Sequence, residues 1–468
     1  MNWEAVIGLE VHAQLATRTK LFCGCSTEFG APPNTHVCPV CLGLPGALPV
    51  PNAKAIELAL LAARALGGAI RKRSVFARKS YFYPDLAKGY QISQFDLPVI
   101  VGGEVPLDEG VGALTRIHLE EDAAKNLHDA SGLTRVDFNR AGVPLIEIVG
   151  EPALHSGEQA EAYLRSLREI LLFIGVNDGN LEEGSFRCDA NVSIRKPGDS
   201  LGTRVELKNI NSFKFVRKAI EFEIARQTAV LEEGGAVVQE TRTWNEDAGR
   251  TIAMRGKEEA HDYRYFPDPD LPPLDVDEAL RARVEAVALR LPRQVRAEWV
   301  ALGLSEEDAH VLSQHPRFVA FFDALLAGLG AEHAKAAANF VRAEVLKHAT
   351  TEGMSATLPV EPDALVQLLR LVHDETINGK IAKRVFATML ETGRAAQQIV
   401  DDEGLAQVTD TGAIEAAVKK VIEDNAEQVA QYRAGKTAVL GYFVGQVMKA
   451  TRGQANPKLV QELLRELL

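Results

Sequence analysis

Five stretches of the chain place charged or polar side chains at every second position. A strand projects successive side chains to opposite faces of its sheet, so each stretch predicts a strand with one polar face. The polar positions are Glu10 and His12; Arg116, His118 and Glu120; Glu147; Arg187, Asp189, Asn191, Ser193 and Arg195; and Arg204, Glu206 and Lys208. Carboxylates and imidazoles bind metal ions, and guanidinium groups bind phosphates. One such strand is most simply a solvent-facing strand, whereas five together favour a site.

Glu147 lies in a strongly apolar string, residues 145–149. A carboxylate in such a strand is costly unless it is paired, protonated or bound to metal. Arg140, across the preceding turn, would be its partner in a purely structural role. The alternative is a Mg²⁺ site completed by Glu10, His12 and one of Glu120 or Glu121.

Four of the five cysteines form two close pairs, Cys23-x-Cys25 and Cys38-x-x-Cys41. Paired thiolates at this spacing are typical of a structural zinc site with tetrahedral geometry. His36 is a candidate substitute ligand, and four reduced thiols are the alternative. The fifth cysteine, Cys188, falls on the apolar face of its predicted strand and is expected in the core.

The segment 78–94 mixes basic and aromatic residues with a Pro and a Gly. Lys79 and Lys88 are candidates for contact with phosphates, and Tyr81, Tyr83 and Tyr90 for stacking on a base or ribose. The alternative is a loop packed by its own aromatic side chains.

The composition is that of a soluble globular protein, with 46% hydrophobic and 25% charged residues among 468. The chain has no apolar run of 18 residues and no signal peptide at its start, so we expect a cytoplasmic protein without a membrane partner. Its net charge is −12, so any contact with nucleic acid must come from a local basic patch. The best candidate is the C-terminal set Arg433, Lys436, Lys449, Arg452 and Lys458, for which an ordinary solvated helix face is the alternative.

The order of patterns predicts an α+β fold. Residues 1–290 mix short strands with helices over 51–66, 156–173 and 215–233, the second beginning at a Ser156/Gln159 capping box. The proline-rich segment 266–273 fits neither a helix nor a central strand. Beyond it the composition is helical, which predicts a helical domain over 291–400 and a helical tail over 401–468.

Long motifs in this sequence resemble one family, the B subunits of heterotrimeric tRNA-dependent amidotransferases. The strings that carry the resemblance are Ile7-Gly-Leu-Glu-Val-His12, Arg78-Lys-Ser-Tyr-Phe-Tyr-Pro-Asp85, Tyr90-Gln-Ile-Ser-Gln-Phe-Asp96, His118-Leu-Glu-Glu-Asp-Ala123, the segment 137–148, Glu183-Gly-Ser-Phe-Arg-Cys-Asp-Ala-Asn191, Glu206-Leu-Lys-Asn-Ile-Asn-Ser212, Asp262-Tyr-Arg-Tyr-Phe-Pro267 and Gly453-Gln-Ala-Asn-Pro457. The match runs essentially from end to end.

The resemblance implies an antiparallel-sheet cradle domain related to glutamine synthetase and guanido kinases, then a helical domain and a helical tRNA-binding tail. It implies a ligase that uses Mg-ATP to phosphorylate the side-chain carboxylate of Glu-tRNA(Gln), Asp-tRNA(Asn) or both. Ammonia from glutamine hydrolysed on the A subunit then displaces the phosphate. The A and C subunits are the implied partners. Only some members carry the cysteine pairs, so zinc would be a stabilising addition.

The resemblance also implies roles for individual residues. The expected Mg²⁺ ligands are His12, Glu121 and Glu147, with Glu10 and Glu120 nearby. Because Glu121 shares the parity of Leu119, the strand would have to end or bulge there. The candidates for ATP and acyl-phosphate oxygens are Lys79, Lys88, Arg140, Arg187 and Lys208. Those for orienting these groups or for lining the ammonia exit are Asp189, Asn191 and Asn209. Further nucleotide contacts are expected from Tyr81, Arg116, Ser193 and Glu206.

Two other classes of protein compete with this interpretation. A stand-alone carboxylate–amine ligase acting on a small acid would share the Mg-ATP sheet without needing a basic helical tail. A non-catalytic RNA-binding subunit would not need Glu10, His12, Glu121 and Glu147 together. Dependence of ATP turnover on charged tRNA separates all three.

Overall fold

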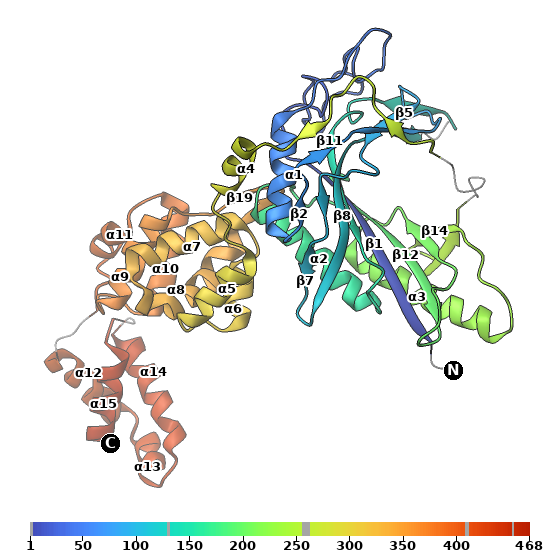
Figure 1. Ribbon diagram of the computed structural model, residues 1–468. Coiled ribbons are helices and arrows are strands. Elements are labelled where there is room, and N and C mark those ends of the chain that lie inside the picture. Colours follow the sequence, from blue (N-terminus) through green and yellow to red (C-terminus); the bar gives the residue numbers. More distant parts are fainter. Residues whose placement is uncertain (1–2, 129–131, 255–262, 408–410, 452–453) are drawn as a thin grey trace. The chain divides into compact units, whose positions relative to one another are not determined.

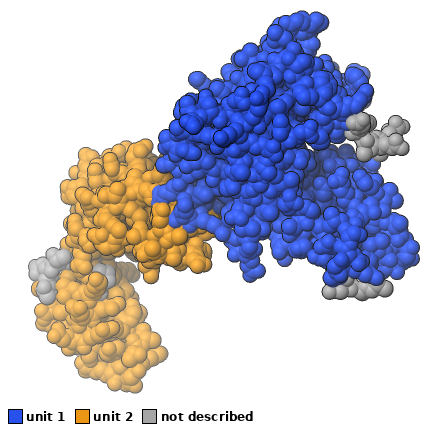
Figure 2. Space-filling view, viewed as in Figure 1, with its two compact units in different colours: residues 1–294 blue, residues 295–468 orange. Residues whose placement is uncertain are grey.

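The computed structural model describes residues 3–128, 132–254, 263–407, 411–451 and 454–468 (Figure 1). The chain divides into two compact units, residues 1–294 and 295–468 (Figure 2). The division falls inside helix α5 (Pro292–Ala301). The expected domain boundaries near residues 290 and 400 stay predictions.

The first unit is built on one large sheet. Its strands follow the order β15-β14-β13-β12-β1-β11-β8-β6-β2, with β7 beside β8. The bounds are β1 (Glu4–Gln14), β2 (Ala69–Ile70), β6 (Ile100–Val101), β7 (Glu104–Pro106), β8 (Val111–Glu121), β11 (Pro144–Gly150), β12 (Phe186–Arg195), β13 (Val205–Lys208), β14 (Thr241–Asn245) and β15 (Arg250–Ala253). The five alternating stretches predicted as strands are confirmed as β1, β8, β11, β12 and β13, and they are consecutive neighbours.

The antiparallel arrangement expected of the large sheet has one exception among the described strands. Strands β13 and β14 run parallel, whereas every other pairing among the described strands is antiparallel. Helix α3 (Phe213–Glu232) lies between these two strands in the sequence. A helical crossover returns the chain to the same end of the sheet, which makes the next strand parallel.

Three helices cover the apolar face of the large sheet. Helices α1 (Ala53–Ala65), α2 (Gly157–Phe173) and α3 confirm the three predicted helices and share one core with the sheet. Leu9, Val11 and Ile148 are fully buried in this core, and Cys188 is buried there as predicted. Because helices occupy the apolar face, the alternating polar residues are left on the opposite face.

The predicted capping box at α2 forms in a shifted version. The Ser156 hydroxyl accepts the backbone N–H of Gln159 at 3.1 Å, as expected. The Gln159 side chain, however, accepts the N–H of His155 at 2.8 Å instead of that of Ser156. The cap therefore also fixes His155, the residue before the N-cap.

A second, three-stranded sheet has the order β16-β4-β5. It comprises β4 (Ala77–Ser80), β5 (Tyr90–Ser93) and β16 (Phe266–Pro267), so Pro267 lies on an edge strand as predicted. Gln91 donates to the backbone oxygen of Glu121 at 2.7 Å and Ser93 contacts Glu120 at 3.3 Å, which fixes β5 against β8. Short pairs β3 (Arg73–Ser74) with β17 (Leu274–Asp275) and β9 (Lys125–His128) with β10 (Thr134–Asp137), and helix α4 (Glu278–Glu285), complete the unit.

The second unit is mainly helical. After α5 it contains α6 (Glu306–Leu312), α7 (Pro316–Leu329), α8 (Ala334–Phe340), α9 (Pro362–His373), α10 (Gly379–Thr392), α11 (Ala396–Asp402), α12 (Thr411–Asp424), α13 (Ala426–Arg433), α14 (Leu440–Ala450) and α15 (Pro457–Leu467). Helices α12–α15 share a core that includes Val418, Phe443, Val447 and Leu464.

The expectation of an all-helical region is wrong at residues 350–357. Strands β18 (Thr350–Glu352) and β19 (Ser355–Thr357) form a hairpin there. Gly353 adopts φ 53°, a left-handed conformation suited to a tight turn. No helix among the described residues is long and apolar enough to cross a membrane.

The buried hydroxyl of Tyr163 should affect the stability of the first unit. Its side chain is 1% exposed, and its hydroxyl has no hydrogen-bond partner among the described residues. Tyr163→Phe removes this unpaired group without leaving a cavity, so the free energy of unfolding should stay equal or rise by up to ~1 kcal/mol. Tyr163→Ala should lower it by several kcal/mol. Calorimetric unfolding temperatures measure both effects, and a lower value for the Phe variant would contradict the prediction.

Candidate active site and cysteine cluster

The register of β1 assembles a polar row across four strands. His12 lies opposite Glu147 on β11 and opposite Arg187 on β12. Glu147 in turn lies opposite His118 on β8. Directly opposed residues point to the same face, so all four side chains project from the face that the helices leave uncovered.

Glu147 is the centre of this row. Its Oε2 lies 3.4 Å from His12 Nε2 and 3.5 Å from His118 Nε2, and its Oε1 lies 3.9 Å from Arg116 Nη2. Arg140 is not a partner, because its guanidinium donates to the backbone oxygens of residues 123 and 124, each at 2.9 Å. The structural alternative for Glu147, an ion pair with Arg140, is therefore wrong.

The carboxylates around His12 shift its pKa, and His12 in turn acts on the pKa values of Glu10 and Glu147. Its Nε2 also lies 3.5 Å from Glu120 Oε1 and 3.6 Å from Glu10 Oε1. Burial alone would lower the pKa of His12, but the hydrogen bond to Glu147 and the nearby negative charges raise it to about 9. Burial would raise the pKa of Glu147, but the two histidines hold it well below its usual range. Burial and repulsion from Glu147 raise the pKa of Glu10.

The carboxylates around His12 form a site at which a bound cation would be stabilised. Ligand atoms of His12, Glu120 and Glu147 all lie within 4.8 Å of one another, and the same is true of Glu10, His12 and Asp189. A few carboxylates with one imidazole suit a divalent ion that keeps waters and substrate phosphates as further ligands. Asp189 and His118 also face this group, although the sequence predicts no metal-site role for either of them.

Glu121 lies outside both groups. Its carboxylate pairs with the ammonium of Lys88 and accepts the backbone N–H of Ile92 at 2.9 Å. Strand β8 continues through residue 121, so the alternation turns Glu121 away from Glu120. Glu121, an expected metal ligand, and Lys88, an expected phosphate contact, therefore pair with each other outside this cluster.

The small sheet contributes Lys79 and a set of aromatic rings. Burial would lower the pKa of Lys79, but the charge of Glu120, together with nearby tyrosines and Glu147, raises it. The ammonium also lies 4.7 Å from the ring centre of Tyr263. Tyr81 contacts Tyr263 edge to face at 5.9 Å. Tyr265, for which the sequence predicts no role, stacks on Phe95 with ring centres 4.2 Å apart.

The other predicted tyrosines lie differently. Tyr90 is covered by the guanidinium of Arg78, 4.2 Å from its ring centre. Tyr83 is 42% exposed. One face of Tyr90 is therefore covered by a basic side chain, and stacking of these tyrosines on a base stays a prediction.

Asp122 organises a second basic part of the site. Its carboxylate lies 3.0 Å from Arg187 Nη2 and 3.6 Å from Arg140 Nε, and it accepts from Gln14 at 2.9 Å. Burial would raise the pKa of Asp122, but the two arginines lower it. Arg187 Nε is buried and has no hydrogen-bond partner among the described residues. The sequence does not predict this role of Asp122, because no alternation pattern continues past Glu121.

The remaining candidates lie along β12 and β13. Lys208 Nζ lies 2.8 Å from Asp189 Oδ2 and 3.1 Å from Glu206 Oε1. These three side chains therefore form one charged group. Ser193 is buried, with its hydroxyl 3.5 Å from the backbone oxygen of Val6. Asn191 is half-buried opposite Gly8 and Glu206. Asn209 is exposed just after β13, with φ 58°.

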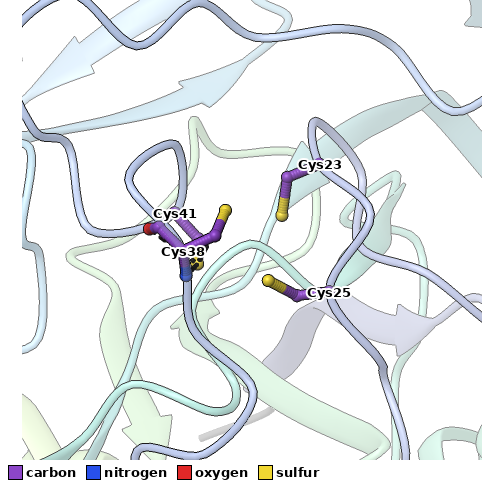
Figure 3. Close-up of side chains that lie close together, drawn as sticks. All are labelled: Cys23, Cys25, Cys38 and Cys41. Atoms are coloured by element: carbon purple, nitrogen blue, oxygen red, sulfur yellow. Dashed lines mark hydrogen bonds between the residues drawn. The ribbon is translucent and has the colours of Figure 1, made fainter.

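The four paired cysteines face one another from two loops (Figure 3). Their Sγ atoms all lie within 4.8 Å of one another, and none forms a disulfide. The hydrogen bond shared with Cys23 lowers the pKa of Cys41 to about 4 and raises that of Cys23. Four converging sulfurs fit a zinc ion held entirely by protein ligands. His36 is not part of the group; its backbone N–H donates to Asn139 at 2.8 Å.

The predicted tRNA contacts are surface groups of the second unit. Arg433, Lys436, Lys449 and Lys458 are exposed. Arg433 Nε donates to the backbone oxygen of Leu468 at 3.0 Å, and Lys458 lies 3.6 Å from Glu375. Arg452 falls outside the described residues.

Comparison with known proteins identifies the family. The model of the GatB/GatE catalytic domain matches residues 5–282, and that of the GatB domain matches residues 320–468. The chain belongs to the GatB family. Its relatives include the aspartyl/glutamyl-tRNA(Asn/Gln) amidotransferase B subunits of Anaeromyxobacter sp. (strain Fw109-5), 54% identical over all of this chain and 99% of the relative, and of Geobacter sp. (strain M21), 52% identical over the whole of both chains. Amidotransferases of this kind are ligases, so the resemblance seen in the sequence is confirmed at the level of the family.

The cysteine cluster yields a prediction about metal content. Purified without chelator, the protein should carry about one zinc ion per chain, since four thiolates fill a tetrahedral site. Cys23→Ser should lose most of this zinc. Cys188→Ser is the matched control and should keep it, because Cys188 lies in the core away from the cluster. Elemental analysis measures the ratio, and a metal-free wild-type protein would refute the assignment.

Proposed function

We propose that this GatB subunit uses ATP to activate the side-chain carboxylate of a glutamate or aspartate misacylated onto tRNA, and then amidates it. The observation that carries the proposal is the convergence of His12, Glu120 and Glu147 on the uncovered sheet face, with Lys79 beside them. The names of the relatives supply the substrates, Glu-tRNA(Gln) and Asp-tRNA(Asn). The likeness of the fold to glutamine synthetase and guanido kinases is part of the same proposal.

The chemistry explains why the site needs both acids and bases. A carboxylate becomes an electrophile only when one of its oxygens is turned into a leaving group. The substrate carboxylate oxygen attacks the γ-phosphorus and ADP leaves; ammonia then attacks the acyl carbon and phosphate leaves. Phosphoryl transfer of this type is catalysed mainly by positioning and by stabilising charge.

The residues divide into two proposed roles. The carboxylates and imidazole of Glu10, His12, Glu120 and Glu147, with Asp189 adjacent, would hold Mg²⁺, which neutralises the phosphate oxygens of ATP when bound. A second set would bind phosphate oxygens and orient the reacting groups: Lys79, Arg116, Arg187, Lys208, Asn191 and Asn209. The buried Nε of Arg187 has no acceptor among the residues that the structure describes. This supports the role, because a buried N–H normally has one.

The other parts of the assembly follow from the family. Ammonia would come from glutamine hydrolysed on the A subunit, in a complex that also contains a C subunit. The aromatic group of Tyr81, Tyr263 and Tyr265 beside Lys79 would contact the nucleotide. Zinc in the cysteine cluster would be structural, because four protein thiolates leave no open position for a substrate.

Glu147→Gln tests the activation step. In the complex with the A and C subunits, this change removes the charge between His12 and His118 and should lower ATP-dependent amidation at least ~100-fold. Glu151→Gln is the matched control: Glu151 is exposed just beyond the same strand and hydrogen-bonds Thr115. ADP release should require Glu-tRNA(Gln) or Asp-tRNA(Asn). Full activity in Glu147→Gln would contradict the metal role, and tRNA-independent hydrolysis would favour a small-acid ligase.

The tail should contribute affinity for tRNA. Reversing the charges of Arg433, Lys436 and Lys449 to glutamate should weaken tRNA binding and lower its salt dependence, because fewer counterions are released. Removing about residues 401–468 should have the same direction of effect and leave glutaminase activity of the complex intact. Lys54→Glu, at an exposed lysine of the first unit, is the control. Unchanged affinity at physiological salt would refute the proposal.

A further inference from the structure

The loop between the two cysteine pairs is joined to the turn that follows β10. The Asn34 side chain accepts the N–H of Phe138 at 2.8 Å and donates to the oxygen of Val136 at 3.1 Å. The Asn34 backbone N–H donates to Asp137 at 2.9 Å. In return, Asn139 accepts the N–H of His36 at 2.8 Å and donates to the oxygen of Pro32 at 2.8 Å. Two loops about a hundred residues apart in sequence therefore hold each other through side-chain amides.

Lys20 lies beneath this junction. Its side chain is 0% exposed, and its ammonium donates to the backbone oxygens of His36 at 2.7 Å and Phe138 at 3.2 Å. One acceptor belongs to the cysteine loop and the other to the turn. Burying an ammonium is costly, so an apolar residue would suit this position better unless the two oxygens require donors.

The turn leads directly to the basic part of the proposed active site. Leu21 N–H donates to the oxygen of Gly142, and Gly142 N–H donates to the oxygen of Asp122, both at 2.8 Å. Gly142 adopts φ +84°, and a Cβ there would lie 3.5 Å from Lys20 Cδ and 3.6 Å from Cys41 Cβ. Arg140, within the same turn, contacts the Asp122 carboxylate that pairs with Arg187. A shift of the turn would therefore move Arg140 directly. It would also move Asp122 through the bond to Gly142, and so change the ion pair between Asp122 and Arg187.

We propose that Lys20 is a positioning residue: its ammonium clamps the cysteine loop to the 138–142 turn and thereby sets the Arg140–Asp122–Arg187 group. The catalytic consequence rests on the proposed function, whereas the clamp itself does not. The charge of Lys20 also acts on Cys41. A zinc ion held by four thiolates would give the cluster two negative charges, and this ammonium would offset part of them.

Lys20→Met keeps most of the side-chain length and removes the donors, whereas Lys20→Gln keeps one neutral donor. The control is Lys54→Met, the same change at an exposed lysine. Hydrogen exchange of segments 31–37 and 136–142 should become about tenfold faster in Lys20→Met, less so in Lys20→Gln, and stay unchanged in the control. In the assembled complex, kcat for amidation should fall on the order of tenfold while tRNA affinity stays unchanged.

Asn34→Gly is the second variant, should Lys20→Met fail to fold. Asn34 is exposed and adopts φ 60°, so glycine removes its side-chain bonds without backbone strain. It should also speed exchange in segment 136–142. Wild-type exchange in both Lys20→Met and Asn34→Gly would overturn the clamp, and faster exchange with unchanged kcat would overturn the positioning role. If the wild-type complex itself lacks ATP-dependent amidation, the proposed function fails, while hydrogen exchange still decides the clamp.

Discussion

The pairing register of β1 is the constraint on which the candidate site depends. Side chains alternate between faces, so a slip of one residue would point His12 and Glu10 at the helices and place Leu9 and Val11 in the polar row. The burial of Leu9 and Val11 beneath the helices therefore fixes where the imidazole and carboxylate lie. Packing on one face determines chemistry on the other, and the apolar residues of β1 are as necessary to the site as the polar ones.

The same arrangement concentrates charge without pairing it fully. Glu10, Glu120 and Glu147 surround one imidazole, and Lys79 approaches from a different sheet. Burial raises the cost of each charge and strengthens the interactions between them. The shifted pKa values of His12 and Glu147 are two expressions of this balance. A divalent cation placed among these ligands would relieve the repulsion among the carboxylates directly.

Alternation in the sequence predicted which residues share the polar face, because strand periodicity is local. It could not give the order of strands or their register, which depend on long-range pairing. For that reason Asp189 and His118 were not recognised as neighbours of His12 and Glu147. Glu121 was expected at the metal although its parity argued against it, and the structure follows the parity. Arg140 pairs with Asp122 and not with Glu147. The sequence could not distinguish the two, because the presence of a turn does not fix where its side chains point. The parallel pairing of β13 and β14 and the 350–357 hairpin likewise depended on connections that periodicity does not encode.

The central place of β1 has a consequence for synthesis of the chain. It leaves the ribosome before either of its two neighbours, which are β11, at residues 144–150, and β12, at residues 186–195. Until both are made, β1 is an apolar strand with two unpaired edges, the kind of segment that pairs with other chains. The last strand of the small sheet, β16, is made later still, because it begins at Phe266. The pairing of β1 can therefore be completed only after residue 195 has been made, and until then its edges are a site that a chaperone would protect from other chains.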